Sequence, residues 1–213
     1  MTRNVMLTED FLIRQINIYL AAIGRILGFK TAYMYIEAQI AVDEALEEIF
    51  GLPANIVRQM DDPALLEAAT HLEVLNLDKL QAAAEVFRQE GELYEMRGQP
   101  EQADAAYRRA LNFYLDVALN GNAWNWPAPD EHIEKLIGKL AGGEFDPDTL
   151  YGLYLYAEPR QQFARAEWLL DHLAHFPDLE EEVRRLRGDF YARLQGVSDG
   201  ILQINGLTRQ YVG

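Results

Sequence analysis

Two histidines have the spacing most suggestive of a reactive site. His172 and His175 lie three positions apart in DHLAHF, so one face of a helix would carry both rings, with Asp171 and Asp178 close by. Pairs with this spacing occur in metal sites. The same residues suit the last turn of a helix, where histidine favours the negative end of the helix dipole. Because Pro177 interrupts the helix before Asp178, we adopt the end-of-helix interpretation and expect no metal.

No other pattern in the sequence indicates a particular enzymatic reaction. The chain has no cysteine, which excludes disulfides, thiolate zinc sites and cysteine nucleophiles. It contains no phosphate-binding loop, dinucleotide fingerprint, GxSxG or HExxH motif. Acidic runs such as 180–182 are followed one turn later by arginines, which is typical of a helix surface. An enzyme with a carboxylate or histidine site stays open as a hypothesis, but we expect no catalytic residue and no cofactor.

Charge and hydropathy argue against a nucleic-acid partner and against a membrane span. The net charge is −15, from 19 basic and 34 acidic side chains, and such a surface repels phosphate backbones, so we expect no nucleic-acid partner. The apolar stretch at 11–29 is interrupted by Arg14, Gln15 and Arg25, so we expect no membrane span. The start of the chain lacks the pattern of a signal peptide. We therefore expect a cytoplasmic protein.

Helix signals dominate the whole chain. Proline is favoured at the first helical position, and Asp62-Pro63, Gln99-Pro100, Asp146-Pro147 and Glu158-Pro159 all stand at expected helix starts. Asp62 and Asp146 would be the N-caps of two of these helices. The segment 120–130 is the clearest loop, and no strand pattern is convincing. The predicted helices lie near 8–28, 31–50, 62–72, 77–97, 100–118, 130–141, 147–157, 159–175 and 178–195, with a weak one near 199–211.

The stretch GELYEMRGQPEQADAAYRRAL, at 91–111, is the most informative in the chain. Small and aromatic residues recur there and just before it, at Phe87, Gly91, Tyr94, Gly98, Ala103, Tyr107 and Ala110. Gly91 and Ala103 suit two helices that approach closely. Gly98 can take a positive φ in a turn, and Pro100 can start the next helix.

Through these residues, positions 84–117 resemble a tetratricopeptide repeat, a 34-residue helix-turn-helix. The pattern departs from the family at Glu90 and Leu115, where Leu and Pro are usual. The resemblance implies an all-α fold in which helix pairs stack into a superhelix, and it implies no chemistry. The whole chain is also similar to a group of uncharacterised bacterial proteins of similar length, from which no activity can be carried over.

Two weaker copies flank this repeat. Aligned on Ala103, they place Ala38 and Ala166 at the same position, 65 and 63 residues away. The copies replace the two glycines of the good repeat with Ile26 and Tyr33 in the first and with Tyr154 and Gln161 in the second. Because one repeat cannot bury its apolar face alone, we predict a single helical domain, 1–213. It would contain repeat-like pairs near 19–52, 84–117 and 147–180, linking helices between them, and a C-terminal helix at 178–195 before a weakly structured tail.

Tetratricopeptide arrays usually bind peptides in a concave groove lined by the first helix of each pair. The resemblance places Glu85, Arg88, Glu92, Glu95, Met96, Tyr151 and Leu155 in that groove. Relatives that clamp a terminal carboxylate use Lys and Asn there, whereas most charges here are acidic, so a basic or cationic peptide or protein fits better. The main hypothesis is a non-catalytic interaction scaffold. A solvated acidic face without a partner is the simpler alternative.

An aromatic pocket would support a different function, the binding of a small molecule or lipid. The run LYGLYLYAEP has too many apolar residues for a one-sided helix. It could line an apolar pocket or a dimer interface, but burial inside the monomer is the favoured interpretation. The residues of such a pocket would be Tyr33, Tyr35, Tyr151, Tyr154 and Leu155.

Two further features could form interfaces. Trp124 and Trp126 in the loop AWNWP are either anchors for a partner or rings that clamp the loop onto the core. The first helix has an apolar stripe with Arg14 and Arg25 at its edges. Packing against the rest of the fold or pairing in a homodimer is the favoured interpretation of this stripe, and binding to a membrane surface is the alternative.

Overall fold

The computed structural model of the protein describes residues 2–71, 74–121 and 128–208, with side chains placed from residue 13 onward except at 71 and 74. These described residues are all-α apart from one short antiparallel hairpin, in which β1 (Thr70–His71) pairs with β2 (Val74–Leu75). The chain divides into two compact units, Met1–Gly142 and Gly143–Gly213. Each unit is described by itself.

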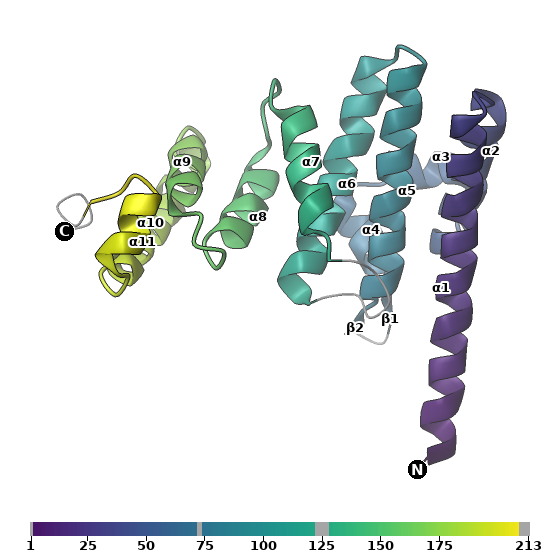
Figure 1. Ribbon diagram of the computed structural model, residues 1–213, viewed down its shortest axis with the longest axis horizontal. Helices are drawn as coiled ribbons and strands as arrows, with labels where there is room; N and C mark the ends of the chain where they lie inside the picture. Colours follow the sequence, from purple (N-terminus) through teal and green to yellow (C-terminus); the bar gives the residue numbers. More distant parts are fainter. Residues whose placement is uncertain (1, 72–73, 122–127, 209–213) are drawn as a thin grey trace. The chain divides into compact units, whose positions relative to one another are not determined.

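The N-terminal unit contains seven helices among its described residues (Figure 1). They are α1 (Thr2–Thr31), α2 (Tyr35–Phe50), α3 (Ala54–Gln59), α4 (Asp62–Ala68), α5 (Leu77–Met96), α6 (Pro100–Asn120) and α7 (Asp130–Leu140). The sequence predicts all of these except α3, which is a single short segment after Pro53. The hairpin was also not predicted, because two-residue strands are too short to show an alternating pattern.

The C-terminal unit contains α8 (Pro147–Ala157), α9 (Phe163–Leu173), the 3-10 helix η1 (Pro177–Leu179), α10 (Glu180–Leu194) and α11 (Asp199–Ile204). The prediction that a helix starts at Pro159 is wrong, since residues 158–162 form the turn that precedes α9. One N-cap is as predicted, because the Asp146 carboxylate accepts the backbone N–H of Thr149 at 2.9 Å. The other is shifted by one residue. Asp61, rather than Asp62, caps α4 by accepting the N–H of Ala64.

The turns between α1 and α2, α5 and α6, and α8 and α9 have the same backbone conformation. Each holds one residue at positive φ, namely Tyr33 at 57°, Gly98 at 69° and Gln161 at 58°. In each, that residue donates its N–H to the carbonyl three positions earlier, and the next residue donates to the carbonyl five positions earlier. These are the residues that the repeat alignment places at one position. The sequence therefore specifies the same turn three times, although glycine is present only once.

Helix α5 is the centre of the N-terminal unit, in contact with α1, α2 and α6 (Figure 1). Its core positions run from Leu80 to Leu93 and surround the helix, whereas an ordinary surface helix buries only one stripe. Gly91 explains how α6 approaches so closely, because a Cβ atom built there would lie 2.4 Å from Cε1 of Tyr107. The small residue at position 91 is thus required by the Tyr107 ring.

Candidate functional site

Glu85 and Arg88 of α5, two of the positions predicted to line a groove, are bonded to each other inside the N-terminal unit. Arg88 donates Nε to Glu85 Oε2 at 2.9 Å and Nη2 to Oε1 at 2.5 Å. The buried Tyr114 hydroxyl donates to Glu85 Oε2 at 2.6 Å, and Gln89 donates to Oε1 at 2.8 Å. Glu85 is buried. A partner therefore cannot reach its carboxylate without opening the fold.

Lys30, at the end of α1, completes this network. Its side chain is buried, and Nζ donates to Gln89 Oε1 and to Glu92 Oε2, each at 2.5 Å. Arg88 also pairs with Glu92. Glu92, a third predicted groove residue, is therefore held from two sides, although its side chain stays partly exposed. Sequence reasoning missed Lys30, because nothing in α1 indicates a lysine that faces the core.

Burial and pairing shift the protonation of this network. Burial by itself would raise the pKa of Glu85, but the hydrogen bonds and charge of Arg88, with those of Tyr114 and Gln89, hold the pKa below its usual range. Burial, together with the charge of Glu85, raises the pKa of Tyr114 well above its ordinary value. His132 of α7 stacks on the Tyr114 ring, with centroids 5.1 Å apart, and burial lowers its pKa. The network keeps fixed charges on Glu85 and Arg88 at neutral pH.

Glu95 and Met96 lie at the exposed end of α5. Glu95 accepts hydrogen bonds from the Tyr107 hydroxyl and from Lys139 Nζ, both at 2.7 Å. Met96 is 40% exposed. Of the five predicted groove positions on α5, these two are therefore on the surface, while Glu85 is inside and Arg88 and Glu92 are partly covered.

A second network ties α5 to α2 and α3. Arg58 donates Nε to the buried Glu90 at 2.8 Å and also pairs with Asp43. Gln39 donates to both carboxylates. Glu90 is the position where the sequence departs from the repeat pattern, and the departure has a physical reason. A buried carboxylate here needs a cation, and α3 supplies one.

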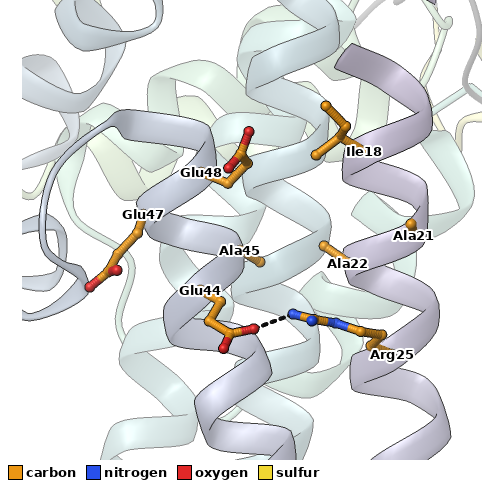
Figure 2. A pocket seen from close by; sticks show the side chains of 8 residues that line it. All are labelled: Ile18, Ala21, Ala22, Arg25, Glu44, Ala45, Glu47 and Glu48. Carbon is orange, nitrogen blue, oxygen red and sulfur yellow. Dashed lines mark hydrogen bonds and ion pairs between the residues drawn. The ribbon is translucent and has the colours of Figure 1, made fainter. Parts of the chain in front are cut away.

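A large groove in the N-terminal unit lies between α1 and α2 (Figure 2), with a volume of about 660 Å³. Its lining residues are Ile18, Ala21, Ala22, Arg25, Glu44, Ala45, Glu47 and Glu48. Figure 2 shows the small apolar side chains between the two helices and the glutamates along α2. The groove thus has an apolar floor and an acidic rim. It lies in the first predicted helix pair, on residues that the sequence did not single out.

The charges at this groove are only partly paired. Arg25 of α1 forms an ion pair with Glu44 of α2 across the groove (Figure 2). Glu47 accepts the backbone N–H of Ala54 at 3.2 Å. Glu48 forms no hydrogen bond or ion pair within the described parts of the chain, and it adds to the effect of burial in raising the pKa of Tyr19. One wall therefore presents negative charge to an incoming partner.

The predicted aromatic residues form two separate pairs. Tyr33 and Tyr35 meet edge to face in the N-terminal unit, with centroids 6.2 Å apart, and Tyr151 and Tyr154 stack in the C-terminal unit at 6.4 Å. Tyr151 lines a pocket of about 250 Å³ bordered by α8, α9 and α10. The other residues of that pocket are Pro147, Asp148, Leu173, Leu179, Glu182, Val183 and Leu186. Leu155 is half-buried and does not line it.

The histidines of the C-terminal unit have local roles. His172 Nδ1 lies 2.8 Å from the carbonyl oxygen of Trp168, and His175 Nδ1 lies 3.3 Å from that of His172. Asp171 pairs with Arg187 at 2.7 Å. Among the described residues, no group of three or more His, Cys, Asp or Glu side chains could hold a metal ion.

Trp124 and Trp126 lie outside the described residues. No described helix is both long and apolar enough to cross a membrane. Comparison of the chain with protein-family models, curated proteins and solved structures finds no match.

Proposed function

We propose that this protein is a non-catalytic interaction scaffold, and that the groove between α1 and α2 binds a basic, amphipathic helical segment of a partner. The observation that carries the proposal is the combination of an apolar floor at Ala22 and Ala45 with glutamates at 44, 47 and 48. An amphipathic helix lays its apolar face into such a groove. Opposite charges at the rim then determine which helices bind.

The site differs from the one that the resemblance implies. Acidic residues on α5 are engaged with Arg88, Arg58 and Lys30, and their exchange for a partner's cations would break buried pairs. On α2, Glu44 pairs with Arg25 in an ion pair that is about half exposed, and Glu47 accepts only a backbone N–H, so neither contact is a buried ion pair. Exposed ion pairs contribute roughly 0–1 kcal/mol, so a partner's lysine can replace Arg25 at little cost.

A designed helical peptide of leucines and lysines, labelled with a fluorophore, tests this proposal. We expect binding that weakens steeply as salt rises, because exposed charges are screened within about 8 Å at physiological ionic strength. Glu44→Gln and Glu48→Gln should each weaken binding about three- to fivefold, corresponding to less than about 1 kcal/mol per exposed charge pair. Glu101→Gln, which removes an exposed acid from α6, is the matched control.

Two outcomes would contradict the proposal. If Glu101→Gln weakens binding as much as Glu44→Gln, the peptide responds only to the net charge of the protein. If a same-length peptide with glutamines in place of lysines binds equally well, the acidic rim does not select the partner. Circular dichroism of each variant checks that the fold is retained.

The pocket beside Tyr151 favours a second candidate function, the binding of a small apolar ligand. Its volume of about 250 Å³ is slightly below the roughly 300–1,000 Å³ of typical ligand sites, so only a small molecule would fit. Native mass spectrometry of the purified protein, compared with its denatured mass, tests this candidate. Extra mass of a few hundred daltons that disappears in Tyr151→Ala would support it.

A further inference from the structure

Exposed apolar side chains concentrate on α1 and α2. Of the fourteen large apolar residues that are exposed among the described side chains, eight lie between Ile13 and Ile40. Ile18 of α1, which lines the groove, is 45% exposed, and Ile36 and Ile40 of α2 are 75% and 52% exposed. Exposed apolar side chains gathered beside a groove often mark an interface.

The exposed faces of the two helices carry opposite charge. Between residues 13 and 31, the exposed charged side chains of α1 are Arg14 and Arg25, and this stretch has no acidic residue, although the whole chain has a net charge of −15. Helix α2 contains five acidic residues and no basic one. Neither Arg14 of α1 nor Glu48 of α2 has an ion-pair partner among the described residues. The α1–α2 hairpin therefore presents one apolar, basic helix beside one apolar, acidic helix.

A surface with both features is complementary to itself. A two-fold axis parallel to the helices would place α1 of one copy against α2 of the other, and the reverse pairing would form at the same time. The basic amphipathic helix that the groove requires is then α1 itself. Small residues also permit close approach, since a Cβ atom added at Gly24 or Gly28 would meet nothing within 4 Å.

We propose that the α1–α2 groove is occupied by the α1–α2 hairpin of a second copy of this chain, so that two hairpins form one four-helix bundle. This inference rests on the proposed function and names the partner of the same groove. Arg25 and Glu44 lie level with each other across the groove (Figure 2). The two-fold axis brings Arg25 of each copy close to Glu44 of the other as well.

The area of the hairpin sets the strength of this dimer. Nineteen helical residues are about 28 Å long, and two helices side by side are about 20 Å wide, so each copy can bury on the order of 560 Å². Stable specific interfaces bury about 800 Å² per partner. We therefore expect a weak dimer, with a dissociation constant in the micromolar range.

Sedimentation velocity of the full-length chain between about 1 and 100 µM tests the proposal. We expect a monomer–dimer equilibrium in the wild type, at least tenfold weaker in Arg25→Glu and in Glu44→Arg, because each reversal places like charges together across the interface. An equimolar mixture of the two variants should dimerise again. In the mixed dimer, the reversed charge at position 25 of one variant meets the reversed charge at position 44 of the other, and the second contact keeps the original Arg25 and Glu44.

A control variant and several outcomes make the test decisive. Glu101→Arg alters an exposed charge of α6 and should leave the dimer unchanged. A wild-type chain that stays monomeric at 100 µM, a dimer that tolerates both reversals, or a mixture no better than its components would each overturn the proposal. Peptide binding by a monomeric chain would overturn this inference and leave the proposed function in place. Failure of a monomeric chain to bind the peptide would reject both.

Discussion

Gly91→Ala tests whether the α5–α6 contact is as rigid as the structure indicates. The added methyl group would lie 2.4 Å from Cε1 and 2.5 Å from Cδ1 of Tyr107. That ring has little room to move, because it is buried, its hydroxyl is bonded to Glu95 at 2.7 Å, and Lys139 Nζ lies 4.9 Å from its centroid. The helices must therefore separate, or the ring must leave its position.

The expected cost follows from two opposing contributions. Overpacking a core by one methyl group costs about 1–3 kcal/mol, and the short contact with Tyr107 favours the upper end of that range. Alanine is favoured over glycine inside a helix by about 1 kcal/mol. Gly91→Ala should therefore lower the free energy of unfolding by about 2 kcal/mol. Gly138→Ala on α7 gains the same propensity and meets nothing within 4 Å, so it should raise stability by up to about 1 kcal/mol.

Urea denaturation followed by circular dichroism measures both variants. Because the two units can unfold separately, hydrogen exchange over residues 77–120 should show that Gly91→Ala loosens α5 and α6. In a Tyr107→Leu background the same substitution should cost clearly less, since the clashing ring is gone. If Gly91→Ala is as stable as Gly138→Ala, the Tyr107 ring does not fix the spacing of these helices, and the reasoning is refuted.

Two further predictions concern pH and the turns. Burial, with a smaller effect of Asp62, raises the pKa of Asp116 to about 6, above the usual value of about 3.9 for Asp. The folded state thus holds this proton more tightly than the unfolded state, so the free energy of unfolding should fall as pH rises from about 4 to 6 and then level off. Asp116→Asn should remove that fall. It should stabilise the protein at pH 7 by about 1–2 kcal/mol once solvent screening is allowed for. Urea titrations at pH 4, 5, 6 and 7 measure the free energy of unfolding of the wild type and of Asp116→Asn. If the two proteins differ by the same amount at every pH, the raised pKa of Asp116 is not the cause. Gln161→Gly should raise stability slightly, by about 0.5 kcal/mol. Glycine removes the cost of about 1–2 kcal/mol that a left-handed conformation imposes on another residue, but its more flexible unfolded chain offsets about 0.4–1 kcal/mol of that gain. Gly98→Ala should lower stability at the matching turn. If Gln161→Gly and Gly98→Ala change the free energy of unfolding in the same direction, the two turns are not equivalent.

Local sequence signals predicted the helices well because their causes are local. Pro100 and Asp146 mark helix starts through backbone geometry and a single hydrogen bond, and both stand where expected. Pro159 shows the limit of such signals. Proline fits a turn as readily as a first helical turn, and the residue at positive φ two positions later, Gln161, decides between them.

The environment of the predicted groove residues could not be read from the same signals. Glu85 and Glu92 have the spacing of an exposed helix face, but Glu85 is buried and bonded to Tyr114, 29 positions later, and Glu92 is partly covered by Lys30, 62 positions earlier. A lysine at the end of an amphipathic helix normally extends into water. Here its position on α1 turns it toward α5. Only the packing of α1 against α5 distinguishes this lysine from Arg25, which faces the groove.

The buried charges of α5 bear on binding through the position of α1. Lys30 is five residues after Arg25 on the same helix, and its two 2.5 Å hydrogen bonds anchor that end of α1 to α5. Removal of one partner from a buried pair costs several kcal/mol, so this end of α1 has little freedom to slide or rotate. A fixed α1 keeps Ile18 and Ala22 at the groove floor and Arg25 beside Glu44. If the proposed groove binds a partner, Glu92, which the repeat pattern assigned to a binding face, contributes to binding indirectly, by accepting the Lys30 hydrogen bond that holds this end of α1 in place.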